Sequence, residues 1–240
     1  MPTFDGKRVF IAGASGGLGA HLAAAFAEAG ADLVLHANTN RAAAHELAAV
    51  LADKHQVSAA VVSGDLTADA DVAAIAAETA AGGPLDAVVS CVTGFSGRPA
   101  AVADLDVAEF RRVVDTDLVA PYALTRALLP LLRAATAPRV LLVSSVAGLR
   151  GRPGAAHLCA AKAGLTGLTL ALARELGPDG ITVNCVAPGP IAGPHAGPMP
   201  ANGLVAPSQP EDVAGAVLFL VSDLNSRING QVVVVNGGLP

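Results

Sequence analysis

Short apolar runs alternate with longer amphipathic segments along nearly the whole chain. The apolar runs, which have the length and composition of strands, lie near residues 8–12, 32–37, 57–62, 85–91, 139–144, 181–186 and 231–236. The segments with helical periodicity lie near residues 17–29, 41–53, 68–81, 106–133, 155–176 and 211–222. This alternation predicts a parallel sheet of seven strands with helices on both faces. Right-handed crossovers make such a sheet doubly wound, and its ligands bind at the carboxyl ends of the strands.

The first predicted strand, 8–12, runs directly into a glycine-rich turn. The turn reads Gly13-Ala14-Ser15-Gly16-Gly17-Leu18-Gly19, and an alanine-rich helical stretch follows it. Glycines in this position let backbone N–H groups approach a pyrophosphate at the positive end of the helix. The strand, turn and helix occur in the right order, so the segment predicts a phosphate-binding site.

One stretch, residues 188–210, breaks the alternation. It contains seven prolines and four glycines. Proline lacks a backbone donor and glycine adds conformational freedom, so this stretch cannot form an ordinary helix. We expect an irregular segment, disordered without ligand.

Composition narrows the function classes. The chain has 240 residues, of which 52% are hydrophobic, which suits one core and a single domain over residues 1–240. Only 15% are charged, the formal net charge is −5, and no basic cluster occurs, which argues against nucleic acid or an anionic membrane as partner. No uninterrupted apolar stretch reaches membrane-spanning length, and the first residues do not resemble a signal peptide, so a cytoplasmic protein is expected.

The three cysteines give no sign of a metal site. Cys91, Cys159 and Cys185 are odd in number and too widely spaced for a metal-binding pair. We expect them to behave as small apolar core residues in a reducing compartment. No metal is therefore predicted.

Five segments resemble the short-chain dehydrogenase/reductase family. The spacing of Gly13, Gly17 and Gly19 is similar to that family's glycine turn, and Asp65-Leu66 resembles its adenine-contacting acidic position after the third strand. Residues 140–145 resemble its fifth strand, which ends on the active-site serine. Residues 184–189 resemble its sixth strand and Pro-Gly turn, and 231–238 its last strand. The resemblance runs from about residue 5 to 239 and implies a single Rossmann-type domain, with a lid over the substrate at about 189–209.

The resemblance also implies an active site, but one position differs. In the family a helix carries Tyr-x-x-x-Lys, and a serine thirteen residues before the tyrosine holds the substrate oxygen. Lys162 and Ser145 match the lysine and the serine, and counting from either residue places Leu158 at the tyrosine position. The family's supporting asparagine falls on Asp117. The catalytic residues implied are therefore Ser145, Lys162 and Asp117, without the usual proton donor.

Three residues could be considered as substitutes for the tyrosine as proton donor. Asp117 could hold a proton if desolvated, or it could simply cap and be solvated. His157 lies about 140° around a helix from Lys162 and either acts as an acid or sits at the helix start or a subunit surface. Tyr122, the only tyrosine, is expected to pack between helices or subunits.

The cofactor implied is NAD(P)(H), with the choice between NAD and NADP undecided. By resemblance, the residues that would hold it are Gly13, Ser15, Gly17, Leu18, Gly19, Asn38, Asp65, Leu66, Lys162, Pro188 and Gly189. Ala37-Asn38 provides no acidic ribose ligand, and Gly16 replaces an arginine common in NADP-preferring members. Arg41 is the sole nearby cation that could touch a 2′-phosphate.

The nicotinamide end of the expected site is also altered. Residues 90–93, Ser-Cys-Val-Thr, replace the family's Asn-Asn-Ala-Gly, and Gly193 falls where a threonine is expected. Because a general acid contributes typically 10²–10⁴-fold, an ordinary ketone reductase with Leu158 would be severely impaired.

Three functions are consistent with this pattern. The first is an NAD(P)H-dependent reductase of a small molecule, with Asp117, water or the substrate as proton source. The second is a non-redox dehydratase, isomerase or cyclase that uses Lys162 or Asp117 as acid or base. The third is a silent assembly protein, since family members form dimers and tetramers through the helices at 106–133 and 155–176. A homo-oligomer is expected in each case.

Overall fold

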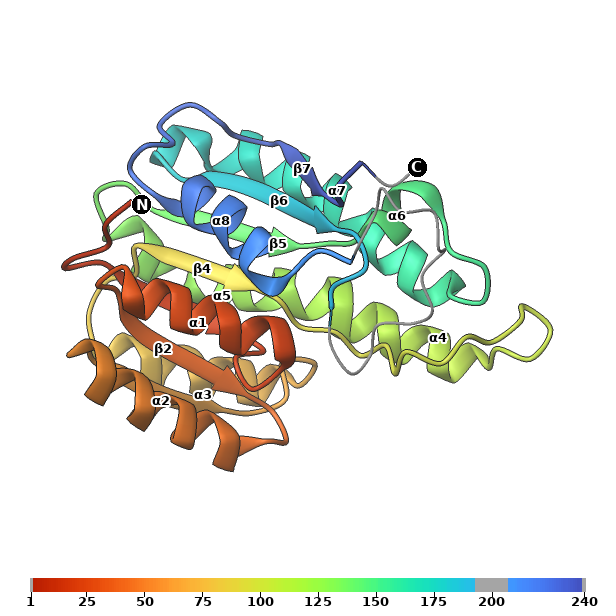
Figure 1. Ribbon diagram of the computed structural model, residues 1–240, viewed down its shortest axis with the longest axis horizontal. Coiled ribbons are helices and arrows are strands. Elements are labelled where there is room, and N and C mark those ends of the chain that lie inside the picture. The colour runs from red at the N-terminus through yellow and green to blue at the C-terminus, as the bar shows by residue number, and fades with distance from the viewer. Residues whose placement is uncertain (1, 193–206, 239–240) are drawn as a thin grey trace.

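The computed structural model describes residues 2–192 and 207–238 (Figure 1). Seven parallel strands form one sheet in the order β3-β2-β1-β4-β5-β6-β7. The strands are β1 (Arg8–Ala12), β2 (Asp32–Ala37), β3 (Ala59–Ser63), β4 (Ala87–Ser90), β5 (Arg139–Val143), β6 (Thr182–Pro188) and β7 (Val232–Val235). This confirms the predicted α/β, doubly wound, seven-stranded parallel sheet.

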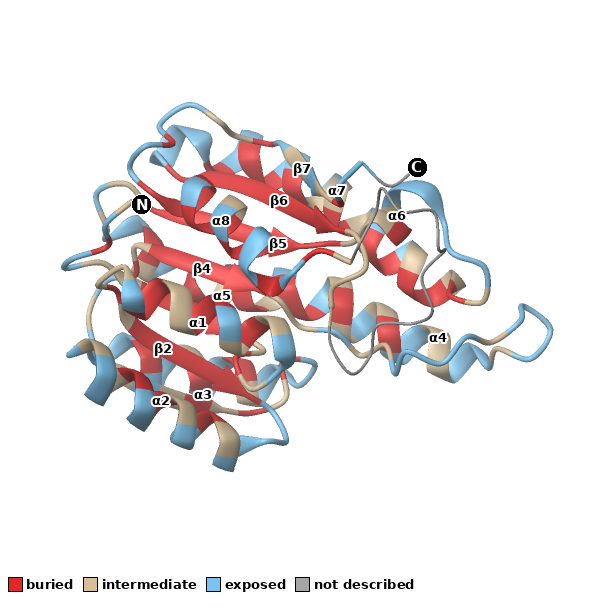
Figure 2. Ribbon diagram, in the orientation of Figure 1, coloured by how far each residue is buried: buried red, intermediate tan, exposed pale blue. Residues whose placement is uncertain are grey.

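Helices cover both faces of the sheet, and both faces of the central strands are buried (Figures 1 and 2). The longer helices are α1 (Gly17–Glu28), α2 (Arg41–His55), α3 (Asp69–Ala80), α4 (Val107–Val114), α5 (Ala120–Arg133), α7 (Ala156–Leu176) and α8 (Pro210–Val221). Successive residues of β1 point to opposite faces, so Val9 and Ile11 join one core and Phe10 and Ala12 the other. The first core includes residues of α1, α2 and α8, and the second includes residues of α3, α5 and α7.

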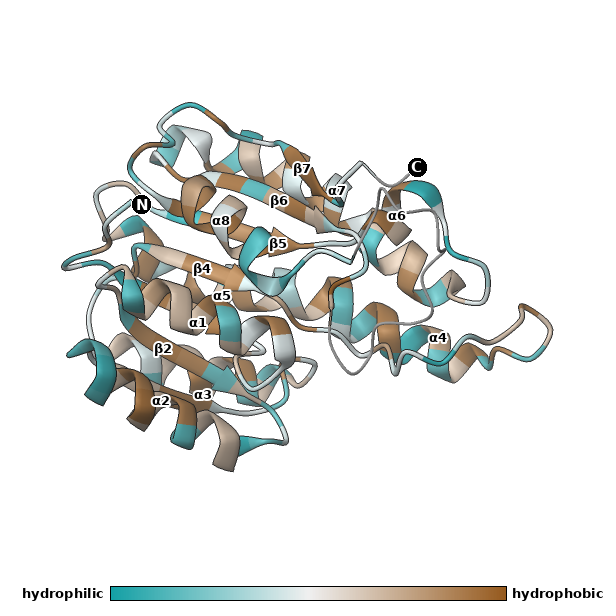
Figure 3. Ribbon diagram, viewed as in Figure 1, coloured by the Kyte–Doolittle hydropathy of each residue, from teal (hydrophilic) through white to brown (hydrophobic). Residues whose placement is uncertain are grey.

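The distribution of hydropathy explains this layering. The central strands are apolar along most of their length, while the helices carry polar residues on their outer surfaces (Figure 3). Strands buried on both faces are typical of parallel sheets, in which helices cover each side. The predicted strand boundaries agree with the observed ones within two residues.

The helix predicted over 106–133 forms over residues 107–133, but it contains a π-helical turn that the sequence did not predict. A π-helical turn, Asp115–Val119, separates α4 from α5, and the N–H of Ala120 donates to the carbonyl oxygen of Asp115 five residues back. Pro121 explains the interruption, because proline has no N–H and its ring clashes with the carbonyl four residues earlier, that of Asp117. Turns of this kind are frequent at functional sites.

Two short helices were not predicted from the sequence. They are α6 (Val146–Arg150) and the 3₁₀ turn η2 (Gly177–Asp179). The first begins immediately after β5, and Ser145 caps it by accepting the N–H of Ala147. A helix of five residues carries too little periodicity to be recognised in a sequence.

Only the two ends of the expected lid lie within the described residues. Ile191 and Ser208 form a parallel bridge, and the N–H of Ala192 donates to the carbonyl oxygen of Ser208. Residues 193–206, including Gly193, lie outside the described part of the chain. The lid itself therefore stays a prediction.

The α7 segment is the one described helix that meets a length and composition test for crossing a membrane, with bounds Ala156–Asp179. The helix packs against the sheet, however, and contributes Leu165, Leu172 and Leu176 to the second core. The helix is therefore part of the layer that covers one face of the sheet, and its apolar residues belong to the hydrophobic core.

Truncation of Leu128 tests this account of the core. Leu128 is fully buried on α5, so Leu128→Ala removes packing and leaves a cavity, and the free energy of unfolding should fall by about 2–5 kcal/mol. Chemical denaturation measures the change. The matched control is Leu224→Ala, at an exposed leucine, which should change the free energy of unfolding by less than about 0.5 kcal/mol. Equal effects would contradict the assignment of the core.

Candidate active site

A cleft of about 470 Å³ opens at the carboxyl ends of β1 to β4. Its wall combines the glycine turn after β1, the ends of β2 and β3, the loop after β4 and the junction of α4 with α5. The lining residues are Gly13, Ser15, Gly16, His36, Asn38, Thr39, Asp65, Leu66, Thr67, Cys91, Val92, Thr93, Gly94, Arg112, Asp115, Thr116 and Ala120. A doubly wound sheet is expected to bind its ligand at this edge.

Two positions of the turn require glycine. Gly13 has a φ of +78°, and a Cβ there would lie 3.3 Å from the backbone of Cys91. A Cβ on Gly19 would collide with the carbonyl oxygen of Gly13. The turn is therefore packed tightly against both the next helix and β4, and its open side lines the cleft with backbone atoms. Such a cradle at the start of α1 fits a pyrophosphate.

The turn after β3 provides the acidic side of the cleft. The carboxylate of Asp65 accepts the N–H of Thr67 at 2.9 Å and its hydroxyl at 2.8 Å. These hydrogen bonds lower the pKa of Asp65. Leu66 beside it is buried, and both residues line the cleft, as the resemblance implied for an adenosine contact.

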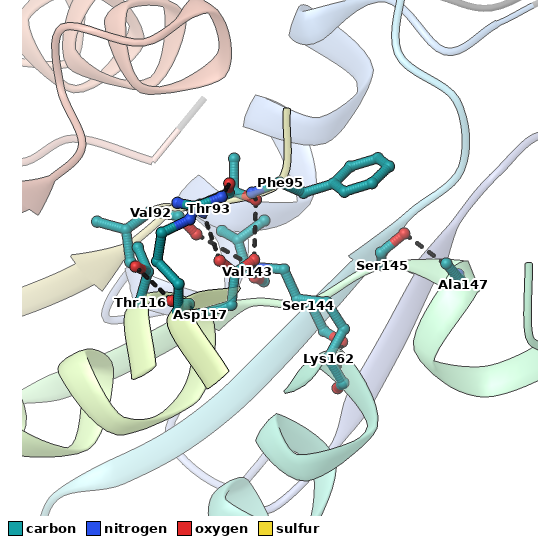
Figure 4. Close-up of polar contacts among 12 residues, drawn as sticks. Val92, Thr93, Phe95, Thr116, Asp117, Val143, Ser144, Ser145, Ala147 and Lys162 are labelled. Carbon is teal, nitrogen blue, oxygen red and sulfur yellow. Dashed lines mark hydrogen bonds and ion pairs between the residues drawn. The ribbon is translucent and has the colours of Figure 1, made fainter. Parts of the chain in front are cut away.

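A buried ion pair lies beyond the cleft, between α7 and the π-helical turn (Figure 4). The Nζ of Lys162 is 3.2 Å from the Oδ2 of Asp117, and their side chains are 6% and 0% exposed. The same Nζ donates to the carbonyl oxygens of Val92 and Val143, each at 3.1 Å. Three acceptors thus surround the three hydrogens of the ammonium group.

Asp117 receives donors on both of its oxygens. Its Oδ2 accepts the hydroxyl of Thr93 at 2.8 Å, and its Oδ1 accepts the N–H of Gly94 at 2.5 Å. The hydroxyl of Thr93 in turn accepts the N–H of Phe95, so its own hydrogen points to Asp117. The carboxylate therefore acts purely as an acceptor, and it holds the loop after β4 to the π-helical turn.

Ser145 follows β5 and lies apart from this network (Figure 4). Its Oγ accepts the N–H of Ala147 at 3.2 Å, and the side chain is half-buried. Within the described residues the hydroxyl hydrogen has no protein acceptor. It remains able to donate to a substrate oxygen.

Leu158 lies one turn before Lys162 on α7 and is 7% exposed. Its side chain belongs to a small apolar cluster with Ala147 and Ala155, against which Phe95 packs. The cluster occupies the space between α6, the start of α7 and the loop after β4. It brings no ionisable group to Ser145.

His157 is the second residue of α7 and is buried rather than at a surface. Its ring meets that of Phe95 edge to face, with centroids 5.3 Å apart. Its Nδ1 has no hydrogen-bond partner among the described residues. Tyr122, in contrast, is 47% exposed on α5.

Cys91 is placed in the cleft wall but is not a reactive thiol. Its Sγ donates to the carbonyl oxygen of Ala12 at 2.9 Å, and burial raises the pKa of the thiol to about 12. A thiol in this state is a weak nucleophile. The described residues contain no group of three His, Cys, Asp or Glu side chains that could hold a metal ion.

The chain resembles known proteins over its full length. Residues 13–240 match the family described as "Enoyl-(Acyl carrier protein) reductase". The chain is 34% identical to the uncharacterized oxidoreductase YmfI of Bacillus subtilis, with 97% of this chain and 98% of that protein covered. It is 33% identical to the 3-oxoacyl-[acyl-carrier-protein] reductase FabG of Rickettsia felis, with 100% and 99% covered.

The fold is also shared with solved structures. The 3-oxoacyl-[acyl-carrier protein] reductase of Brucella melitensis superposes with a TM-score of 0.90 at 32% identity, over 99% of this chain and 92% of that chain. A short chain dehydrogenase from Salmonella enterica superposes with a TM-score of 0.88 at 25% identity, over 98% and 99%. The chain belongs to the short-chain dehydrogenase/reductase family. It is thus an oxidoreductase of that type, in a family that usually binds NAD(P)H.

Within this short-chain dehydrogenase/reductase, only part of the expected cofactor set lines the cleft. Gly13, Ser15, Asn38, Asp65 and Leu66 do so. The remaining expected residues are absent from the cleft wall. Gly17, Leu18 and Gly19 lie in the first turn of α1, and Lys162 lies beyond the loop after β4. Pro188 and Gly189 lie at the end of β6. Arg41 begins α2, is exposed, and its Nε donates to the carbonyl oxygen of Asn38.

Sequence reasoning missed several residues of the cleft. His36 and Arg112 line it but were not predicted, and Thr93 was noted only as a departure from the family pattern. A histidine directly after the apolar run 33–35 of β2 was a visible signal. Arg112 carried none, because it lines the cleft through a contact with the distant loop after β4, where it donates to the carbonyl oxygen of Gly94.

The buried pair predicts strong coupling between Lys162 and Asp117. Lys162→Met leaves a buried carboxylate without its countercharge and should lower the free energy of unfolding by about 3–5 kcal/mol. The double variant Lys162→Met/Asp117→Asn should lose less, because neither charge then remains unpaired. Urea denaturation of both single variants and the double variant measures the coupling. Additive losses would show that the two charges do not stabilise one another.

Proposed function

We propose that this chain is an NAD(P)H-dependent reductase that works without a tyrosine proton donor. The observation that carries the proposal is the arrangement at α7, where an intact lysine is paired with Asp117 while apolar Leu158 fills the position one turn earlier. The lysine and the serine that the family uses are thus kept, and the phenol is not. Asp65 and the glycine turn supply the binding half of the site.

The residues of the cleft fit a dinucleotide. Gly13, Ser15 and Gly16 line the cleft just before α1, where a phosphate would meet backbone N–H groups. Asp65 and Leu66 would hold the adenosine end, and the loop after β4 leads from it toward Lys162. When bound, the cofactor supplies a hydride to the substrate.

Asp117 is not well suited to donate the proton. Both of its oxygens accept hydrogen bonds, and Lys162 lies 3.2 Å from one of them. Its role in the proposal is to neutralise Lys162 and to hold the loop of Thr93 and Gly94 in place. Water or the substrate itself then serves as the proton source, and Ser145 orients the substrate through its free hydroxyl hydrogen.

This arrangement favours an activated alkene over a simple ketone as substrate. A ketone needs a proton on its oxygen as the carbonyl is reduced, and a tyrosine normally delivers it. A conjugated alkene spreads the negative charge onto its carbonyl group and takes its proton later, on carbon, from water. Because the family and its relatives are named for enoyl and 3-oxoacyl acyl-carrier-protein reductases, we propose 2-enoyl thioesters as the first substrates to test, with 3-oxoacyl thioesters as the ketone comparison.

An assembly role remains the second candidate function, and two observations favour it. All three hydrogens of Lys162 have protein acceptors, so the lysine is held without any ligand. Val119 and Tyr122 of the α4–α5 segment and Leu170 of α7 are apolar side chains exposed on the helices expected to form an oligomer. We propose a homo-oligomer through these helices.

Dinucleotide binding is the first test of the proposed function. Calorimetric titration with NAD, NADH, NADP and NADPH should show micromolar binding of one reduced cofactor. Gly13→Ala should weaken that binding about tenfold or more, because it strains a positive φ and crowds Cys91. Gly167→Ala is the matched control, since a Cβ there has no atom within 4 Å, and it should bind normally. No binding of any of the four ligands would favour the assembly role.

Restoring the phenol tests the role of Leu158. Leu158→Tyr combined with Asp117→Asn should raise the rate of 3-oxoacyl thioester reduction by about 10²–10⁴-fold, since a proton donor returns and Lys162 is no longer neutralised by a carboxylate. Leu158→Phe with Asp117→Asn is the control, because it adds the ring without the hydroxyl. NADPH and NADH oxidation measured by absorbance gives the rates. An equal rate in the tyrosine and phenylalanine variants would refute this account of position 158.

A further inference from the structure

His36 joins the two turns that form the dinucleotide end of the cleft. It lies on β2, is 2% exposed, and lines the cleft. Its Nε2 is 3.0 Å from the carbonyl oxygen of Gly64, in the turn after β3. The N–H of Gly13, in the glycine turn, approaches its Nδ1 at 3.4 Å. One side chain thus spans the phosphate-binding and adenosine-binding turns.

These contacts determine which tautomer is present. The carbonyl oxygen of Gly64 can only accept, so Nε2 must carry the hydrogen. The N–H of Gly13 can only donate, so Nδ1 must present a lone pair. Phe10 of β1 stacks along the ring, with centroids 6.4 Å apart and planes inclined by 18°, and limits its rotation. The site accommodates one neutral tautomer of the imidazole.

We infer that neutral His36 is the positioning residue that holds the glycine turn against the Asp65 turn, and that its protonation opens the cleft and releases a bound dinucleotide. Protonation places a hydrogen on Nδ1, directly opposite the N–H of Gly13. Two donors then face each other in a buried space, and the glycine turn must move. The part of the inference that concerns the dinucleotide rests on the proposed function.

The surroundings of His36 oppose its protonation. Burial, the largest effect, lowers its pKa, while the hydrogen bond to Gly64 and the charge of Asp65 raise it in part. Asp71 of α3 faces the same turn, but its carboxylate accepts the N–H of Asp65 at 2.7 Å. Cys91, from the loop after β4, lines the same cleft with its thiol protonated. The glycine turn and Phe10 add no titratable group.

Because burial lowers the pKa of His36, both the stability and the dinucleotide affinity should fall as the pH is lowered. The pKa of His36 is lower in the folded protein than in the unfolded chain, so the unfolded chain binds a proton first as the pH falls. Stability and dinucleotide affinity are therefore full above the ordinary histidine range. The stability contribution declines as the pH falls below the unfolded-state pKa. The cleft opens only when the pH reaches the folded-state pKa.

The deciding experiment needs no ligand. In an NMR titration of the whole protein, the ring signals of His36 should show one protonation step, and the amide signals of Gly13 and Asp65 should shift with the same midpoint. In His36→Asn, which keeps an acceptor near the Nδ1 position but does not titrate, those amide shifts should vanish. His45→Asn, at an exposed histidine of α2, is the matched control and should leave them unchanged. If the amide signal of Gly13 does not shift as His36 is protonated, the inference is overturned.

Calorimetry then measures the consequence for binding. Affinity of the wild type for the preferred dinucleotide should fall about tenfold for each pH unit below the midpoint of His36, since only the neutral fraction binds. The affinity of His36→Asn should change little over the same range, and this comparison cancels any protonation of the ligand itself. An equal fall in both proteins would overturn the role of His36 in binding. If no dinucleotide binds at any pH, the proposed function fails, and the NMR titration alone decides whether His36 holds the two turns.

Discussion

The buried pair of Lys162 and Asp117 is the interaction on which the candidate site depends. It joins α7 to the π-helical turn, and through Thr93 and Gly94 it also fixes the loop that follows β4. Charges removed from water are costly unless opposite charges and hydrogen bonds compensate them. Here two carbonyl oxygens, one hydroxyl and one backbone N–H complete the shell around the pair. The pair therefore stabilises the arrangement of these three segments, and it is also a candidate catalytic pair.

The closed shell around the pair leaves no hydrogen of the Lys162 ammonium group without a protein acceptor. A lysine that binds a cofactor needs an N–H group that is free to donate a hydrogen bond. Each hydrogen of Lys162 already has an acceptor in the protein. Binding of a cofactor must then compete with Val92, Val143 or Asp117 for the ammonium group. Leu158, one turn before Lys162, packs in an apolar cluster and presents no ionisable group to the lysine.

The dinucleotide end of the cleft is organised differently, by backbone geometry and one neutral side chain. Gly13 and Gly19 allow the turn to pack against Cys91 and α1 without a Cβ, and His36 holds this turn to the neighbouring one. Among the described residues, no buried ion pair lies at this end of the cleft. The two ends thus place their polar groups for different tasks, ligand binding at one and rigidity at the other.

The sequence by itself determined the order of strands and helices, the parallel sheet and the glycine turn, because these depend on periodicity and on glycine's lack of a Cβ. It also placed Leu158 one turn before Lys162. Only the tertiary structure decided which polar groups meet: Asp117 reaches Lys162 through a π-helical turn imposed by Pro121, and His36 meets Gly13 and Gly64 across three strands. Periodicity carries no signal for a single extra residue in a helical turn. Contacts between residues distant in sequence arise only when the sheet brings their strands together.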